Sequence, residues 1–179
     1  MDGTANRVPM TRADGPPRVL VAGIGNIFFG DDGFGSEVAR ALLADGGLPD
    51  SVRVVDYGIR GMHLAYDVLD GYDTLIIVDA LPGGGAAGEL TVLGVGPDDL
   101  GSGEFDAHGM NPVAVLASIS LLGGTLPRTI VVGCRPLTVE EGIGLSAPAR
   151  RAMAAALSTI HGLVQQALTL QTAGPGGRS

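Results

Sequence analysis

Short apolar segments that alternate with helical segments most strongly limit what this chain can fold into. Segments suited to strands lie at 18–23, 51–56, 74–79 and 129–133, and an edge strand is expected at 89–93. Helices are predicted at 33–44, 62–69 and 111–122, and a long final helix is predicted to start near Ala147. Such alternation is typical of a parallel sheet with helices on both faces. We therefore predict a three-layer α/β/α fold around a five-stranded, mostly parallel sheet.

The predicted domain spans residues 18–171 of the 179-residue chain. Residues 1–17 are polar and contain several prolines, without the continuous apolar segment of a signal peptide, so we expect a disordered leader. Residues 172–179 have the same character and are expected to form a flexible tail. No segment reaches the roughly 18 continuous apolar residues of a membrane span.

The charged residues and the single cysteine exclude several functional classes. The 11 basic residues are outnumbered by 19 acidic ones, for a net charge of −8. Because this balance repels phosphate backbones and anionic lipids, we expect neither a nucleic-acid nor a membrane partner. Every basic residue is an arginine, which removes the lysine of Schiff-base chemistry and of phosphate loops. Cys134 has no second cysteine to pair with, and we expect it to pack in the core of a cytoplasmic protein.

The loop after the first strand, GIGNIFFGDDGFG at 23–35, is rich in glycine but does not fit a nucleotide site. A dinucleotide fingerprint needs glycine three residues after Gly25, where this chain has Phe28. A phosphate loop needs Lys and Ser or Thr where Asp31 and Asp32 stand. Two carboxylates repel a phosphate, so we expect this loop to face a cation. The alternative is that Asp32 caps the following helix.

Further aspartates end the next two predicted strands, Asp56 the second and Asp79 the third. In a parallel sheet the carboxyl ends of neighbouring strands lie at one edge, about 5 Å apart. These residues and the Asp31–Asp32 pair are therefore expected to gather there. Clustered carboxylates raise each other's pKa unless a cation compensates, which favours a divalent cation. Alternatively, each is an ordinary strand-ending aspartate bonded to the turn that follows.

His108, in the motif DAHGMN, precedes the helix that leads into the fifth strand. If that strand is parallel to the first three, this helix starts at their carboxyl edge and brings His108 to Asp32 and Asp79. Two carboxylates and an imidazole suit nickel, zinc, cobalt or iron. Three protein ligands also leave positions open for substrate or water. The other histidines, His63 and His161, are expected to be structural or solvated.

The segments GIGNIFFGDDGFG, VVDYGIRGMHL, LIIVDA and DAHGMN together resemble the peptidases that mature nickel–iron hydrogenases. The resemblance runs from Arg18 to the last helix. It implies a twisted five-stranded sheet between helices. It also implies a single endoproteolytic cut that removes a C-terminal extension from the hydrogenase large-subunit precursor after nickel insertion. The implied metal-binding triad is Asp32, Asp79 and His108, with Asp56 as a further functional residue.

On this resemblance we expect nickel to arrive bound to the precursor, and we expect no permanently held metal. Asp32, Asp56 and Asp79 are then the expected catalytic residues, and Asp31 and Arg60 are expected to bind substrate. The general base remains open among the first-loop aspartates and Asp56. Some family members place two glycines after the second-strand aspartate, where this chain has YGIRG, and this departure bears on substrate choice. A monomer is expected.

Two other functional classes fit parts of the pattern. A non-catalytic nickel-binding maturation chaperone would use the same carboxylates and histidine without cutting anything. A magnesium-dependent phosphotransfer or receiver-like domain also gathers aspartates at a sheet edge, but it normally needs a lysine at a later strand end, and this chain has none. The mass of the precursor after incubation separates a peptidase from a carrier.

Overall fold

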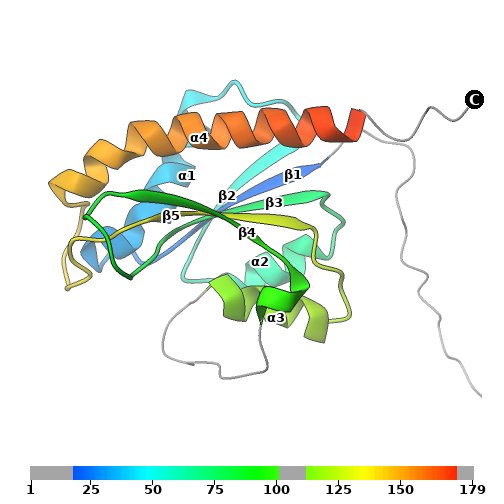
Figure 1. Cartoon of the computed structure of the whole chain (residues 1–179), viewed down its shortest axis with the longest axis horizontal. Helices are drawn as coiled ribbons and strands as arrows, with labels where there is room; N and C mark the ends of the chain where they lie inside the picture. The colour runs from blue at the N-terminus through cyan, green and yellow to red at the C-terminus, as the bar shows by residue number, and fades with distance from the viewer. Residues whose placement is uncertain (1–17, 101–111, 173–179) are drawn as a thin grey trace, which may run out of the picture.

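A five-stranded sheet lies between two layers of helices in the computed structural model, which describes residues 18–100 and 112–172 (Figure 1). The strands in these ranges are β1 (Val19–Ile24), β2 (Val52–Gly58), β3 (Thr74–Ala80), β4 (Leu90–Val95) and β5 (Arg128–Cys134). The helices are α1 (Phe34–Asp45), α2 (Gly61–Val68), α3 (Pro112–Leu121) and α4 (Ala147–Thr172), with short 3-10 helices η1 (Gly30–Gly33) and η2 (Pro97–Leu100). The predicted fold class is confirmed.

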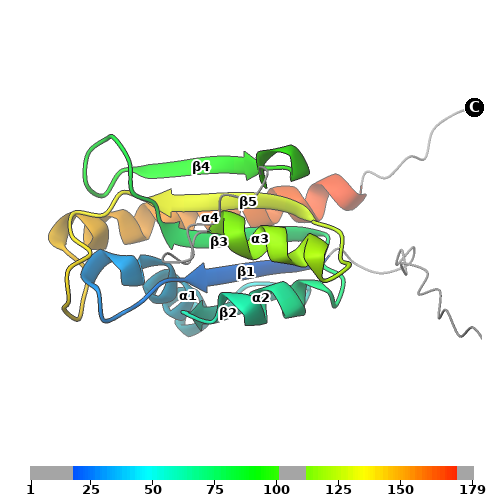
Figure 2. The same ribbon diagram turned by 90° about the horizontal axis from the view of Figure 1, so that it is seen from below.

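The strand order is β2-β1-β3-β5-β4. The strands β2, β1, β3 and β5 are parallel, whereas β4 pairs with β5 in the antiparallel direction at the edge of the sheet. The arrows of Figure 2 show this reversal, and they show the carboxyl ends of the parallel strands at one side of the molecule. The edge position expected for the segment 89–93 is therefore confirmed.

The core fills both faces of the sheet, with α1 and α4 on one face and α2 and α3 on the other (Figure 1). In β3, Ile76 and Val78 pack in the cluster that contains α1 and α4. Leu75 and Ile77 pack in the cluster that contains α2 and α3. Because side chains alternate along a strand, the next residue, Asp79, belongs to the face covered by α2 and α3.

The strand β2 continues beyond the predicted end at residue 56. Its register with β1 shifts between Gly23 and Ile24, so that Gly58 pairs with Ile24 and Tyr57 lies in a bulge. The Tyr57 ring is buried, and its hydroxyl donates a 2.6 Å hydrogen bond to a carboxylate of α2. A buried ring with a satisfied hydroxyl keeps this segment on the sheet, although the aspartate before it suggested a strand end.

The final helix, α4, has the predicted apolar stripe. Ile160 and Val164 are fully buried, and Met153, Leu157 and Leu168 pack against the same cluster. The helix continues to Thr172, one residue past the predicted end of the domain, and residues 1–17 and 173–179 lie outside the described residues. Within the described ranges, no helix combines the length and the apolar character that crossing a membrane requires.

The start of α1 sits directly on the backbone of the sheet. A Cβ atom on Gly35 would overlap the carbonyl oxygens of Ile24 and Val78, so only glycine fits at this contact. Gly25, at the end of β1, has a φ of 139° and lies equally close to the backbone of Asp32. These two contacts hold the loop after β1 against the carboxyl ends of β1 and β3.

We expect Gly35→Ala to lower the free energy of unfolding by about 2–4 kcal/mol, because the added methyl group has to displace two strands. Gly162→Ala is the matched control, since a Cβ at this exposed position of α4 meets no atom within 4 Å. In the helix interior it should stabilise by roughly 0.5–1 kcal/mol. Urea unfolding of both variants measures the difference, and equal midpoints would contradict the close contact.

Candidate functional site

Asp79 is buried at the carboxyl edge, with 4% of its surface exposed. Among the described carboxylates of this edge, only Asp31 is more deeply buried. Asp79 lies one residue before the end of β3, and its Oδ1 accepts a 2.8 Å hydrogen bond from the backbone N–H of Ala80. Burial raises the pKa of this carboxyl well above its usual value, and the negative charge of Asp32 raises it further. The Ala80 N–H opposes these effects without cancelling them. Asp32 and Asp79 are therefore electrostatic neighbours, as the strand ends predicted.

Asp32 approaches this position from η1, at the end of the glycine-rich loop. Its side chain is half-buried, and its Oδ2 accepts a 2.9 Å hydrogen bond from the backbone N–H of Asn26. The alternative that Asp32 caps the next helix is wrong, because the N-cap of α1 is Gly33 and carries no side-chain cap bond. Asp32 instead closes its own loop and keeps its carboxylate beside Asp79.

Asp32 and Asp79 are the two candidate site carboxylates that the fold brings into electrostatic contact at this edge. Burial and a neighbouring negative charge both disfavour ionisation of Asp79, and a bound cation would offset this cost. Carboxylate oxygens are hard donors that suit a divalent metal. Across residues 18–100 and 112–172, no three His, Cys, Asp or Glu side chains converge as a metal site. The predicted third ligand, His108, lies outside the described residues.

Asp56 is not brought to this pair. Its Oδ2 accepts a 3.0 Å charged hydrogen bond from Nε of Arg40 on α1, and its Oδ1 accepts one from the backbone N–H of Gly58 at 3.0 Å. The bond to α1 places the carboxylate on the sheet face opposite to that of Asp79. This geometry matches the alternative of a strand-ending aspartate bonded to the turn that follows, and the catalytic role expected for Asp56 stays a prediction.

Asp31 is only 1% exposed and is occupied by the chain's own donors. Its Oδ2 accepts hydrogen bonds from Ser146 Oγ at 2.7 Å and from the Leu137 N–H at 2.8 Å, and its Oδ1 accepts one from the Ser146 N–H at 2.7 Å. Burial raises the pKa of this carboxyl, but the hydrogen bonds from Ser146, Leu137 and Thr138 outweigh it and leave the pKa lowered. The side chain faces inward and joins two loops, and the role expected for Asp31 in binding substrate stays a prediction.

Arg60 is exposed at the entrance of α2. Its Nε and Nη2 donate 3.3 Å hydrogen bonds to the backbone carbonyls of Tyr57 and Asp56, respectively. These bonds hold the guanidinium at the rim of the carboxyl edge, where it remains open to solvent. Its role in substrate binding stays a prediction.

Within the described residues, the other histidines and the cysteine do not join the carboxylate pair in a metal site. His63 is exposed on α2, and His161 is partly buried on α4. Cys134 is 1% exposed in the core, as predicted, and burial raises the pKa of its thiol to about 11. This thiol is therefore neutral and unreactive at physiological pH.

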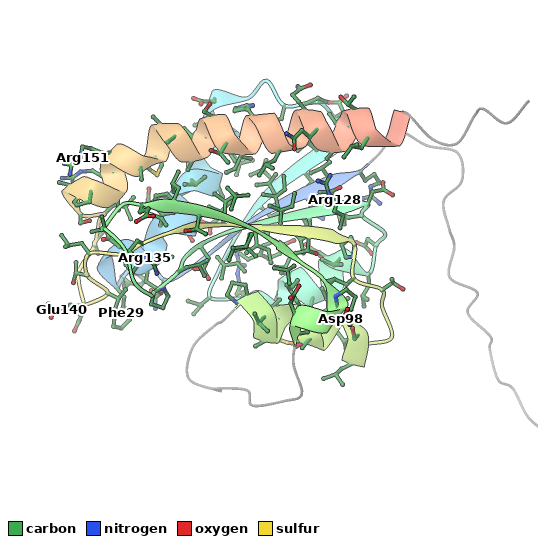
Figure 3. The ribbon with its side chains drawn as sticks, in the orientation of Figure 1. Phe29, Asp98, Arg128, Arg135, Glu140 and Arg151 are labelled. Atoms are coloured by element: carbon green, nitrogen blue, oxygen red, sulfur yellow. The ribbon has the colours of Figure 1, made fainter. Side chains whose placement is uncertain are left out.

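Sequence reasoning missed Arg135, which follows β5 at the same edge (Figure 3). Its Nη1 donates a 3.1 Å hydrogen bond to the carbonyl of Leu81, and its guanidinium lies against Gly83, so that it fastens the loop between β3 and β4 next to Asp79. An arginine directly after an apolar strand, in a chain without lysine, was the available signal. Phe28 and Phe29, both exposed in the glycine-rich loop, were also given no role.

Comparisons with known proteins agree with one another. The sequence model of a family described as hydrogenase maturation protease matches residues 36–163. The chain is 33% identical over 164 residues to the hydrogenase expression/formation protein HupD of Rhizobium leguminosarum bv. viciae, which covers 90% of this chain and 81% of HupD. Among solved structures it is similar to the hydrogenase maturating endopeptidase HybD from E. coli, with 29% identity, a TM-score of 0.72, and coverage of 83% of this chain and 93% of HybD. The maturation protease HycI from Thermococcus kodakarensis aligns at 25% identity and a TM-score of 0.67, over 84% of this chain and 94% of HycI.

We expect Asp79→Asn to stabilise the metal-free protein at neutral pH, because the amide keeps the bond from Ala80 and avoids the free-energy cost of burying a carboxyl whose pKa burial raises. A gain of about 1 kcal/mol raises Tm by roughly 2–4 °C in a domain of this size. The pKa of Asp79 is higher in the folded protein than in the unfolded chain. Wild type therefore loses stability as the pH rises from the unfolded-state pKa through the folded-state pKa. The gain in Tm of Asp79→Asn over wild type should thus shrink as pH falls from 7 toward 4. Thermal melts of both proteins across this pH range measure it. A loss of stability at neutral pH would contradict the raised pKa.

We expect Asp31→Asn to have the opposite effect, lowering the free energy of unfolding at pH 7 by roughly 2–4 kcal/mol through lost charge-assisted hydrogen bonds. The pKa of Asp31 is lower in the folded protein than in the unfolded chain. The carboxylate therefore stabilises the fold at any pH above its unfolded-state pKa, and this contribution is lost as the pH falls through its folded-state pKa. The difference from wild type should therefore narrow below about pH 4. Asp50→Asn, at an exposed turn, is the control and should leave the free energy of unfolding at pH 7 unchanged.

Proposed function

The chain belongs to the hydrogenase maturation protease family, and from that premise we propose that it removes the C-terminal extension of a nickel–iron hydrogenase large-subunit precursor after nickel has been inserted. The protein is a maturation endopeptidase, in line with the solved structures that it resembles. The observation that carries the finer proposal is the neighbouring carboxylate pair of Asp32 and the buried Asp79.

The carboxylate pair supplies a reason for the enzyme to act only on loaded precursor. Without a cation, burial and the charge of Asp32 keep Asp79 protonated to a pH well above its usual range. A divalent ion carried by the precursor lets both carboxylates ionise and act as ligands. His108 is the proposed third donor, as an imidazole suited to nickel. The precursor holds the nickel, so the enzyme needs only an open, incomplete ligand set.

Binding of the precursor's nickel would fix the scissile bond next to the carboxylates. Holding reactants in place in this way can contribute several kcal/mol to lowering the barrier. Asp31 and Asp56 are committed to donors of the chain itself, so we assign the acid–base chemistry on water to the Asp32–Asp79 pair. Arg60, exposed at the rim, is proposed to contact the precursor chain.

We expect Asp79→Asn and His108→Ala each to slow cleavage of nickel-loaded precursor by at least about 100-fold, because each removes a ligand or an acid–base group. His161→Ala is the matched control, since this histidine lies well inside α4, away from the start of that helix at the carboxyl edge, and its rate should equal that of wild type. Intact-mass measurement of the precursor after incubation detects loss of the C-terminal peptide. Circular dichroism confirms that each variant is folded.

The same assay separates the alternatives. Wild-type cleavage by both Asp79→Asn and His108→Ala would overturn the assignment of the triad. Equal cleavage of nickel-free and nickel-loaded precursor would overturn nickel recognition and leave the endopeptidase activity standing. An unchanged precursor mass, together with nickel binding, would identify a nickel-binding maturation chaperone instead.

A further inference from the structure

Large apolar side chains are exposed together at the carboxyl edge of the sheet. They come from the loop after β1 and from the loop between β5 and α4, and their exposed fractions run from 43% to 81%. We call this set the apolar rim, and it consists of Phe28, Phe29, Leu137, Val139 and Ile143. Isolated exposed apolar residues are common, but five on two adjoining loops are typical of an interaction surface.

The two loops of the apolar rim are joined by their backbones. The N–H of Gly142 donates to the carbonyl of Phe28 at 2.8 Å, and the N–H of Gly30 donates to the carbonyl of Gly142 at 2.8 Å. Phe29 and Gly142 form an isolated parallel bridge. Figure 3 shows Phe29 and Glu140 at the same end of the molecule, one from each loop. The apolar rim is therefore one surface.

The buried carboxylate of Asp31 makes this surface rigid. Asp31 belongs to the loop after β1. It accepts hydrogen bonds from Leu137 and Ser146, which lie at the beginning and the end of the loop between β5 and α4. The exposure of the apolar side chains is therefore built into a fixed loop pair. A preformed apolar surface loses less conformational freedom on binding than a flexible one, which favours affinity.

The apolar rim is continuous with the carboxylate pair. The N–H of Phe28 donates to the side chain of Asn26 at 3.0 Å, and the N–H of Asn26 donates to Asp32 at 2.9 Å. A polypeptide that contacts Phe28 is thus within a few residues of the carboxylates. A chain whose bond is cut at Asp32 and Asp79 can therefore contact this rim at the same time.

The charges around the apolar rim indicate the character of its partner. Glu140 and Glu141 are exposed in the second loop, beside Val139 and Ile143. They add to the excess of acidic residues in the chain, whose net charge is −8. Such a surface favours an apolar segment that carries arginine or lysine over an acidic one.

We propose that the apolar rim is the docking surface for the precursor polypeptide around its scissile bond, and that it receives an apolar segment flanked by basic residues. This inference rests on the proposed function, because the precursor is the partner. It assigns recognition of the polypeptide to residues that do not touch the nickel. Affinity for the precursor therefore has two separable sources, the apolar rim and the carboxylate pair.

The test compares a double variant of the apolar rim, Phe28→Ser with Ile143→Ser, with the control Leu121→Ser. Leu121 is 82% exposed at the end of α3, remote from the carboxyl edge. The Kd for nickel-loaded precursor, and KM and kcat for its cleavage, are measured for each. We expect Kd and KM to rise by about 10–100-fold in the double variant, since hot-spot side chains carry most binding energy, while kcat stays within about twofold. Leu121→Ser should match wild type in all three.

The acidic contribution is tested separately with Glu140→Gln combined with Glu141→Gln. We expect a rise in Kd of roughly 3–10-fold at low salt that disappears at high salt, because exposed charges are screened. Precursor binding is measured by itself, so a precursor that is not cut, but that binds wild type more tightly than the double variant, would contradict the proposed endopeptidase activity while supporting the docking surface.

Three outcomes would overturn the docking surface. The first is an unchanged Kd in a folded double variant while wild type cleaves normally. The second is an equal loss of affinity in Leu121→Ser, which would show a general effect of exposed apolar residues. The third is a wild-type dimer in sedimentation that the double variant converts to a monomer with unchanged precursor affinity, which would make the apolar rim a contact between two copies of this chain.

Discussion

Backbone contact between the loop after β1 and the ends of β1 and β3 determines the geometry of the whole carboxyl edge. Gly35 lies where any side chain would overlap the carbonyl oxygens of Ile24 and Val78, and Gly25 makes a comparable approach to the backbone of Asp32. The loop can therefore take only one position on the sheet. That position carries one carboxylate toward Asp79 and leaves its neighbour buried beneath the loop.

The two adjacent aspartates of this loop have opposite roles for a physical reason. Asp31 is buried among four hydrogen-bond donations and stays charged, which is the way a structural carboxylate can be accommodated inside a protein. Asp32 stands beside a carboxyl whose pKa is raised by burial, a combination that opposes folding at neutral pH. We attribute the retention of such an unfavourable pair to its proposed function. Asp31, whose oxygens are all hydrogen-bonded, anchors the loops that carry Asp32 and the apolar rim.

Strand positions and the fold class were predictable because they depend on local pattern. Apolar segments such as TLIIVD, bounded by turn residues, form strands in any context that supplies neighbours. The neighbouring position of Asp32 and Asp79 was also predictable, since parallel strands present their carboxyl ends at one edge. The opposite placement of Asp56 was not, because the two residues before it, Val54 and Val55, are both apolar and the sequence contains no sign of which face each one takes.

The sequence by itself determined the alternation of strands and helices, the acidic carboxyl edge and the family resemblance, all of which follow from residue types and their spacing. Only the tertiary structure decided what each aspartate contacts. Asp56 is bonded to Arg40 and Asp31 to Ser146, residues that are distant in sequence and meet only when α1 and the last loop pack on the sheet. Likewise, Phe28 and Ile143 form one surface because backbone bonds join their loops, and no local pattern encodes contacts over such a separation.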